Sequence, residues 1–187
     1  MRVIAGKARS LPLKTPNGAD TRPTTDRIKE TLFNMLMPYL PGSVFVDLFS
    51  GSGGIGIEAL SRGAGRAYFI ESGKEAQECI HSNVLFTHME EQSVILKQDV
   101  FAALKGSIRE HADIIFMDPP YDHLLEKKVL EILKDASYID EDTLIIIEAS
   151  LQTDFSYVSE YGFEVIKDKR YKTNKHLFLK KSLEGGK

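Results

Sequence analysis

The 187-residue chain is long enough for one globular domain, and its 42% hydrophobic and 27% charged residues exclude a collagen-like, low-complexity or wholly disordered protein. Its single cysteine, Cys79, excludes an intramolecular disulfide framework and a cysteine-rich zinc site. The longest apolar runs, 114–117 and 144–147, are far shorter than the ~20 residues of a membrane-spanning helix, and no signal-peptide core follows Met1. We therefore expect a cytoplasmic protein with no membrane partner.

The net charge of −3 is unevenly distributed. Residues 1–29 contain seven Lys and Arg but only two acids, whereas the remainder of the chain is strongly acidic. A basic arm on an acidic body indicates a polyanionic partner, although a solvated terminus without a function explains the same pattern. If the partner is a nucleic acid, the candidate contacts are the basic side chains Arg2, Lys7, Arg9, Lys14, Arg22 and Arg27.

The first 41 residues are expected to form a small extension of a hairpin and a helix. Segments 2–5 and 10–14 can pair, with Pro12 tolerated because it lies on an edge strand. Residues 16–18, Pro-Asn-Gly, predict a turn. A helix should then begin after Thr24 or Thr25, with Asp26 in its first turn and an apolar face formed by Ile28, Leu32, Met35, Leu36 and Tyr39.

From residue 43 onward, apolar strands alternate with helices. Strands are predicted at 44–49, 67–71, 93–98, 113–117 and 143–148, with helices at 54–62, 74–88, from 100, and at 124–134. This alternation indicates parallel pairing in a doubly wound α/β sheet. Two last strands, 163–171 and 176–181, are too close for a crossover helix and must be antiparallel. A mostly parallel sheet with one terminal hairpin is the architecture of Rossmann-like class I methyltransferases. We place this domain at residues 42–182, followed by a tail at 183–187.

A glycine-rich loop follows the first of these strands. Gly51, Gly53 and Gly56 match the pattern G-x-G-x-x-G, in which glycines allow a tight turn and close approach to a ligand. Glu71 ends the next strand, where a carboxylate can accept hydrogen bonds from ribose hydroxyls. These features are compatible with either NAD or S-adenosylmethionine as the ligand. They are also compatible with a plain strand–helix turn that binds no ligand.

Two carboxylates favour S-adenosylmethionine. Asp47 precedes the glycines, where it can bind the amino group of a methionine moiety but would repel a pyrophosphate. Asp99 ends the third predicted strand and can accept a bond from the adenine amino group. It can equally cap the helix that follows.

The sequence Asp118-Pro119-Pro120-Tyr121 follows the fourth predicted strand. Ligands of open parallel sheets bind beyond the carboxyl ends of the strands, so this loop should face the same crevice as the glycines. Two prolines make it rigid and remove two N–H donors. The Asp118 carboxylate and the Pro119 carbonyl can then hold the hydrogens of an exocyclic amino group, while Tyr121 stacks on the base. A rigid turn with a core tyrosine is the alternative.

These motifs together resemble a known family. Asp118-Pro-Pro-Tyr121 is similar to the signature of amino-methyltransferases that act on adenine, cytosine or guanine. The resemblance becomes more specific when this loop is combined with two further segments, Arg22-Pro-Thr-Thr-Asp-Arg27 and Asp47-Leu-Phe-Ser-Gly-Ser-Gly-Gly-Ile-Gly56. This combination resembles the bacterial 16S ribosomal RNA guanine-(2-amino) methyltransferases, the RsmD family, over nearly the whole chain.

The resemblance implies a seven-stranded sheet, S-adenosylmethionine as donor, and a guanine of small-subunit rRNA, free or in an assembled subunit, as acceptor. It assigns the acceptor site to Asp118, Pro119, Pro120 and Tyr121. The cofactor site is assigned to Asp47, Phe49, Gly51, Gly53, Glu71, Ser72, Asp99 and Val100. Neither a metal nor an obligate protein partner is expected.

Two segments depart from the family pattern. The opening hairpin of the family often has a glycine near Ser10, and its last hairpin often reads Tyr-Gly-Asp-Thr where this chain has Tyr171-Lys-Thr-Asn-Lys-His176. The first lies in the basic arm and the second in a turn at the sheet end, so both bear on the RNA site and not on the cofactor.

Three alternatives remain open from the residues alone. A DNA or RNA adenine amino-methyltransferase shares the acceptor loop, although the chain has little room for a domain that reads duplex bases. An NAD-dependent oxidoreductase shares the glycines but fits poorly with Asp47. A non-catalytic RNA-binding protein shares the fold but has no need of Asp118.

Overall fold

The computed structural model describes residues 1–16, 26–120 and 124–182. Several sequence-based predictions fall wholly or partly outside these ranges, namely the turn at 16–18, the helix caps Thr24 and Thr25, the site residues Arg22 and Tyr121, and the tail at 183–187.

A seven-stranded sheet forms the centre of the described molecule, with strand order β3-β2-β1-β4-β5-β7-β6. The five parallel strands are β1 (Val44–Leu48), β2 (Arg66–Ile70), β3 (Ser93–Leu96), β4 (Ile114–Met117) and β5 (Leu144–Ser150). The remaining strands, β6 (Phe163–Arg170) and β7 (Asn174–Lys181), pair antiparallel at one edge. The predicted α/β architecture with a C-terminal hairpin is confirmed.

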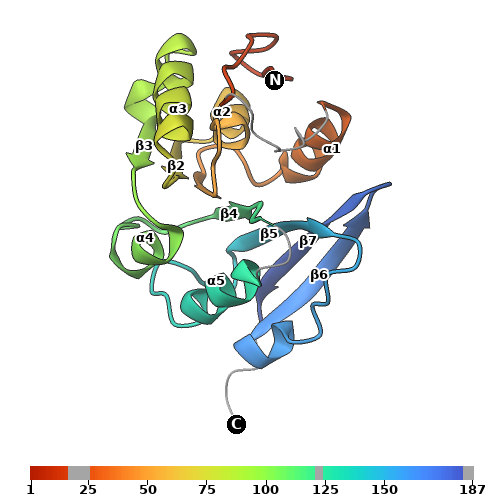
Figure 1. The fold of residues 1–187 in the computed structure, drawn as a ribbon. Helices are drawn as coiled ribbons and strands as arrows, with labels where there is room; N and C mark the ends of the chain where they lie inside the picture. The colour runs from red at the N-terminus through yellow and green to blue at the C-terminus, as the bar shows by residue number, and fades with distance from the viewer. Residues whose placement is uncertain (17–25, 121–123, 183–187) are drawn as a thin grey trace.

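Helices cover both faces of the sheet (Figure 1). On one face lie α1 (Asp26–Leu36), α2 (Gly54–Ser61) and α3 (Lys74–Phe86), and on the other lie α4 (Val100–Gly106) and α5 (Leu125–Leu133). Strand residues alternate between the two layers, so that Phe116 packs under α1 and α2 whereas Met117 packs under α4 and α5. Two short 3-10 helices, Glu90–Gln92 and Val158–Tyr161, connect elements.

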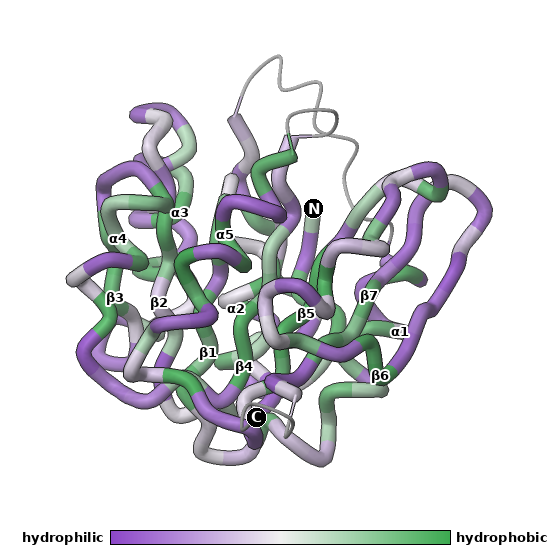
Figure 2. Tube along the Cα trace, turned by 90° about the horizontal axis from the view of Figure 1, so that it is seen from below, coloured by the Kyte–Doolittle hydropathy of each residue, from purple (hydrophilic) through white to green (hydrophobic). Residues whose placement is uncertain are grey.

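Hydropathy follows this layering. The central strands β1, β4 and β5 are buried on both faces and mostly apolar, whereas the β6–β7 hairpin carries long hydrophilic stretches (Figure 2). Most residues of β6 are exposed, which is usual for an edge strand.

One prediction about the N-terminal extension is confirmed and another is wrong. Segments 2–5 and 10–14 pair antiparallel, as predicted, although only at one bridge between Arg2 and Pro12. The flanking bonds run from Val3 N to Leu11 O (3.0 Å) and from Leu13 N to Met1 O (2.9 Å), so the bridge does not need the N–H that Pro12 lacks. Tyr39 is 47% exposed and lies beyond the end of α1, so it does not belong to the buried helix face.

The extension packs tightly against α2. Val3, Ala8 and Leu13 join the same apolar cluster as Phe45 of β1 and Ile57 of α2. Gly6, with φ +84°, allows this approach, because a Cβ there would lie 1.8 Å from the carbonyl oxygen of Ser61.

A buried carboxylate in α2 fixes the extension in place. Glu58 accepts hydrogen bonds from the backbone N–H groups of Ile4 (2.7 Å) and Ala5 (3.0 Å), and it forms ion pairs with Lys29 (3.3 Å) and Arg62 (2.7 Å). Lys29 is only 1% exposed, and burial lowers the pKa of its ammonium. One of the seven basic residues of the arm is therefore structural and does not face solvent.

Candidate active site

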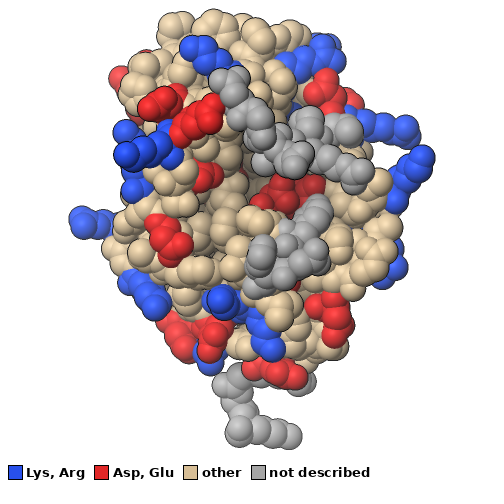
Figure 3. All heavy atoms as spheres, viewed as in Figure 1, with Lys and Arg blue, Asp and Glu red and all other residues tan. Residues whose placement is uncertain are grey.

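Four carboxylates lie at the carboxyl ends of four neighbouring strands: Asp47 in β1, Glu71 after β2, Asp118 after β4 and Glu148 in β5. This is the edge where ligands bind in open α/β sheets. The space-filling view shows acidic side chains gathered in a hollow at the centre of one face (Figure 3).

The loop between β1 and α2 has the backbone that its glycines predict. Gly51 and Gly53 have φ of +54° and +79°, and Phe49 is also left-handed, with φ +58°. A left-handed bulky residue is strained, and such strain concentrates at functional sites. At Gly56 a Cβ would lie 2.4 Å from the ring of Phe69, so the glycine allows α2 to pack closely on the sheet.

Asp47 of β1 is buried, only 2% exposed, and its side chain reaches the first turn of α2. Its Oδ2 accepts a hydrogen bond from Gly56 N (3.0 Å). Burial raises the pKa of the Asp47 carboxyl to about 7, the Gly56 N–H lowers it, and the charge of Glu71 raises it further. A cationic group beside this buried carboxyl would favour its charged form and pair with it.

This arrangement tests which cofactor fits. In a dinucleotide site the N–H groups at the helix start receive a pyrophosphate. Here the Asp47 carboxylate already accepts a hydrogen bond from the Gly56 N–H. Its negative charge therefore lies where the phosphates of a dinucleotide would bind. The residues fit a ligand with a positive amino group, as in S-adenosylmethionine, and disfavour a dinucleotide.

Glu71 and Asp99 are held by backbone amides. Glu71 accepts from Gly51 N through Oε2 (2.9 Å) and from Gly73 N through Oε1 (2.8 Å). Asp99 caps α4, with Oδ1 accepting from the N–H groups of residues 101 (2.9 Å) and 102 (3.3 Å). The capping role foreseen for Asp99 is thus present, and a bond to adenine would need its other oxygen.

The other predicted cofactor residues lie around the same loops. Ser72 is exposed directly after Glu71, and Val100 is buried as the first residue of α4. Phe49 and Gly53 belong to the glycine loop itself.

Asp118, Pro119 and Pro120 follow β4 directly, as predicted. Asp118 is half-buried, Pro119 is buried and Pro120 is exposed. Burial raises the pKa of the Asp118 carboxyl well above its usual range, and the charges of Glu148 and Asp47 raise it further. The described chain resumes at Leu124, which has a left-handed φ of 50° before α5.

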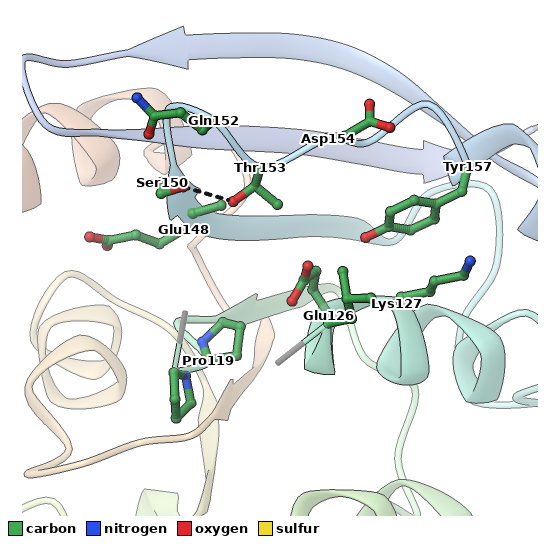
Figure 4. A pocket seen from close by; sticks show the side chains of 12 residues that line it. Pro119, Glu126, Lys127, Glu148, Ser150, Gln152, Thr153, Asp154 and Tyr157 are labelled. Carbon is green, nitrogen blue, oxygen red and sulfur yellow. Dashed lines mark hydrogen bonds between the residues drawn. The ribbon is translucent and has the colours of Figure 1, made fainter. Parts of the chain in front are cut away.

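A cavity of about 280 Å³ opens beside the two prolines, between the end of β5 and the start of α5 (Figure 4). Its wall combines Pro119 and Pro120 with Glu126 and Lys127 of α5 and the ring of Tyr157. The Tyr157 hydroxyl is buried and has no hydrogen-bond partner within the described residues. The cavity can thus offer a ligand both an apolar surface and polar side chains.

Sequence reasoning missed a buried network at the end of β5. Glu148 is bound by Asn174 Nδ2 (2.5 Å) and by His176 Nε2 (3.0 Å), both from β7. The His176 Nδ1 in turn meets the Tyr171 hydroxyl at 3.1 Å. The available signal was Glu148 itself, a carboxylate that ends a strand beside the acceptor loop.

The predicted RNA-contacting residues that the structure describes lie on the surface. Arg2 pairs with Asp26 (2.8 Å) and the Lys7 ammonium bonds to Gln92, whereas Arg9, Lys14 and Arg27 are exposed. These exposed side chains of the N-terminal extension are together called the basic rim.

Residues 1–16, 26–120 and 124–182 contain no helix that is long and apolar enough to cross a membrane. In the same ranges, no group of three or more His, Cys, Asp or Glu side chains is arranged to hold a metal ion.

Comparisons with known proteins bear on the family and the fold of the chain. A family model described as "conserved hypothetical protein 95" matches residues 1–180. The ribosomal RNA small subunit methyltransferase D of Haemophilus influenzae is 34% identical over 171 residues, which are 90% of this chain and 88% of that protein. The counterpart of the same name in Escherichia coli K12 is 33% identical over 81% of this chain and 76% of its own length.

Solved structures share the whole fold. The Escherichia coli protein yhhF superposes with a TM-score of 0.82 and 27% identity, covering 97% of this chain and 98% of its own.

Proposed function

The chain belongs to the RsmD family of rRNA methyltransferases, and we propose that it transfers a methyl group from S-adenosylmethionine to the exocyclic 2-amino group of a guanine in small-subunit ribosomal RNA. The observation that carries this proposal is the shared sheet edge. It combines a carboxylate at the α2 N-terminus, suited to a cationic donor, with the Asp118-Pro119-Pro120 loop, suited to an amino acceptor.

On this proposal, Asp47, Glu71 and Asp99 hold the cofactor. When bound, S-adenosylmethionine supplies a methyl group activated by a positive sulfonium. Glu71 is oriented by two amides, so it can accept from ribose hydroxyls without a rearrangement of its backbone. Asp47 meets the positive amino group, which favours its charged form.

The acceptor loop positions the amino nitrogen. Its lone pair is delocalised into the base, so the amino group is a weak nucleophile. Asp118 and the Pro119 carbonyl accept its hydrogens and turn the lone pair towards the methyl group, so catalysis rests mainly on positioning. The raised pKa of the Asp118 carboxyl makes its ionised form a stronger base for the proton that the nitrogen then releases.

The basic rim supplies affinity for the phosphates of the RNA. Arg9, Lys14 and Arg27 are exposed on the extension, which packs on α2 next to the glycine loop. Contacts of this type position a nucleic acid but do not read its sequence, so the base must be selected in the acceptor pocket.

The proposal is tested by transfer of labelled methyl to three substrates in parallel: naked small-subunit rRNA, assembled small subunits and duplex DNA, all from cells that lack this activity. We expect label on one guanine, recovered as 2-methylguanine after digestion. Label on adenine, or on DNA alone, would refute the guanine assignment and leave the amino-methyltransferase chemistry standing. The better of the two ribosomal substrates identifies the form that is recognised.

A further inference from the structure

The buried network around Glu148 lies next to the acceptor loop. Met117 of β4 is paired with Ile147 of β5, so Asp118 and Glu148 are the next residues along two adjacent parallel strands. Such strands are ~4.8 Å apart. Phe116 and Ile146, two residues earlier, both face the layer of α1 and α2, and alternation along the strands directs Asp118 and Glu148 to the same side.

Glu148 is held on both carboxylate oxygens. Asn174 Nδ2 binds Oε1 and His176 Nε2 binds Oε2, at 2.5 and 3.0 Å. With the Tyr171 hydroxyl donating to His176 Nδ1, the ring presents its other N–H to Glu148. Glu148 is 5% exposed and His176 is fully buried, so this carboxylate has a fixed position and is not a mobile surface charge.

One acceptor of this network, the Asn174 amide oxygen, has no donor among the described residues. Because Asn174 directs its amide N–H to Glu148, its Oδ1 points elsewhere, and that oxygen is buried without a hydrogen-bond partner in the described part of the chain. Asp118 next to it can only accept while ionised. A ligand that fits here must offer several adjacent N–H groups, because buried acceptors left unpaired are costly.

Guanine offers such an edge and adenine does not. The 2-amino group of guanine is next to N1–H, so three hydrogens lie side by side. In adenine the amino group is next to N1 with a lone pair, which a neighbouring carboxylate would repel. A fixed carboxylate on the strand next to Asp118 therefore distinguishes the two purines, because it attracts N1–H of guanine and repels the N1 lone pair of adenine.

We propose that Glu148 accepts a hydrogen bond from N1–H of the target guanine and so selects guanine over adenine, with His176 and Asn174 as the residues that position it. This inference rests on the proposed function and deepens it, because it assigns base selection to a residue outside the Asp118–Tyr121 motif.

The test replaces the labelled guanine of the RNA by 2-aminopurine, which keeps the 2-amino group but has a lone pair at N1. For the wild-type protein we expect kcat/KM to fall at least 10-fold with 2-aminopurine. In Glu148→Gln the side-chain amide can donate to that lone pair. The ratio of kcat/KM for guanine to kcat/KM for 2-aminopurine should then fall at least 10-fold relative to wild type, even if both values decrease.

Two further variants support the measurement. Glu131→Gln removes an exposed carboxylate of α5 and should keep the wild-type ratio. If Glu148→Gln does not fold, Glu148→Asp retains the charge and withdraws the carboxylate, and a reduced preference for guanine is again expected. A folded Glu148 variant with the wild-type ratio would overturn the inference, as would a wild-type protein that accepts both bases equally. Failure of the proposed function is distinguishable, because then the wild-type protein labels no guanine in the parent RNA.

Discussion

The two halves of the sheet edge that carries the proposed site hold their carboxylates by different means. At β1 and β2, where the cofactor is proposed to bind, Asp47 and Glu71 accept hydrogen bonds from backbone amides of the glycine loop and its surroundings. At β4 and β5, where the acceptor base is proposed to bind, Glu148 is held by the side chains of Asn174 and His176, 26 and 28 residues away in the sequence.

The difference has a physical consequence. Every residue except proline carries an amide donor, so the cofactor half depends on backbone conformation and hence on glycines. The acceptor half depends on particular side chains of β7 and can change when they are replaced. On the proposed assignment, substitutions in β7 can therefore alter the choice of acceptor base without disturbing the cofactor half.

The strongest way to test the contrast is to remove Asp118. We expect Asp118→Ala to lower methyl transfer by about 10³-fold, because the amino group loses its main acceptor. Affinity for S-adenosylmethionine should remain within about threefold, since none of its proposed ligands is touched. Calorimetric titration with the cofactor and a transfer assay measure the two quantities on one sample.

The reciprocal variant is Glu71→Gln. It should weaken S-adenosylmethionine binding about 10-fold or more, and the loss of rate should be recovered in large part at high cofactor concentration. If Asp118→Ala also abolished cofactor binding, the separation of the two halves would be wrong.

This contrast also explains what could be predicted from the sequence. The alternation of strands and helices, the glycine loop and the strand-end acids are local patterns, and they predicted the sheet, its terminal hairpin and the positions of Asp47, Glu71 and Asp118 at the sheet edge. The partners of Glu148 could not be foreseen, because β7 reaches β5 only after the chain has crossed to the sheet edge. The same holds for Lys29, which local charge counting assigned to the basic arm and which Glu58 of α2 holds in the core.

A different effect, on stability instead of activity, is expected from the pH dependence at Asp47. Its carboxyl has a pKa of about 7 in the folded protein and an ordinary value near 3.8 when unfolded. The folded state therefore binds the proton more tightly, and this contribution to stability is lost as the pH rises from about 4 through 7. Relative to wild type, Asp47→Asn should gain stability over this range, by up to ~1.4 kcal/mol per pH unit.

Urea unfolding at pH 5 and pH 7.5 measures the difference between the two proteins. Asp135→Asn, which removes an exposed carboxylate, controls for the change in net charge. A constant difference between Asp47→Asn and wild type at both pH values would show that the buried carboxyl titrates normally.

The smallest expected effect is on stability. It concerns two residues with strained backbones, one in the proposed cofactor site and one outside it. Phe49 in the cofactor loop and Ser10 in the N-terminal extension both have left-handed backbones, with φ of 58° and 70°. If strain at Phe49 serves the site and strain at Ser10 does not, Ser10→Gly should raise stability without a loss of activity. The relief of a left-handed residue is worth ~1–2 kcal/mol, and the extra freedom of glycine in the unfolded chain offsets part of it. A net gain of about 0.5–1 kcal/mol corresponds to a rise in Tm of roughly 1–4 °C for a domain of this size.

Scanning calorimetry of Ser10→Gly, with Ser10→Ala as the matched control that keeps a Cβ, measures this rise in Tm. A higher Tm for the alanine variant than for the glycine variant would show that the backbone at Ser10 is not strained.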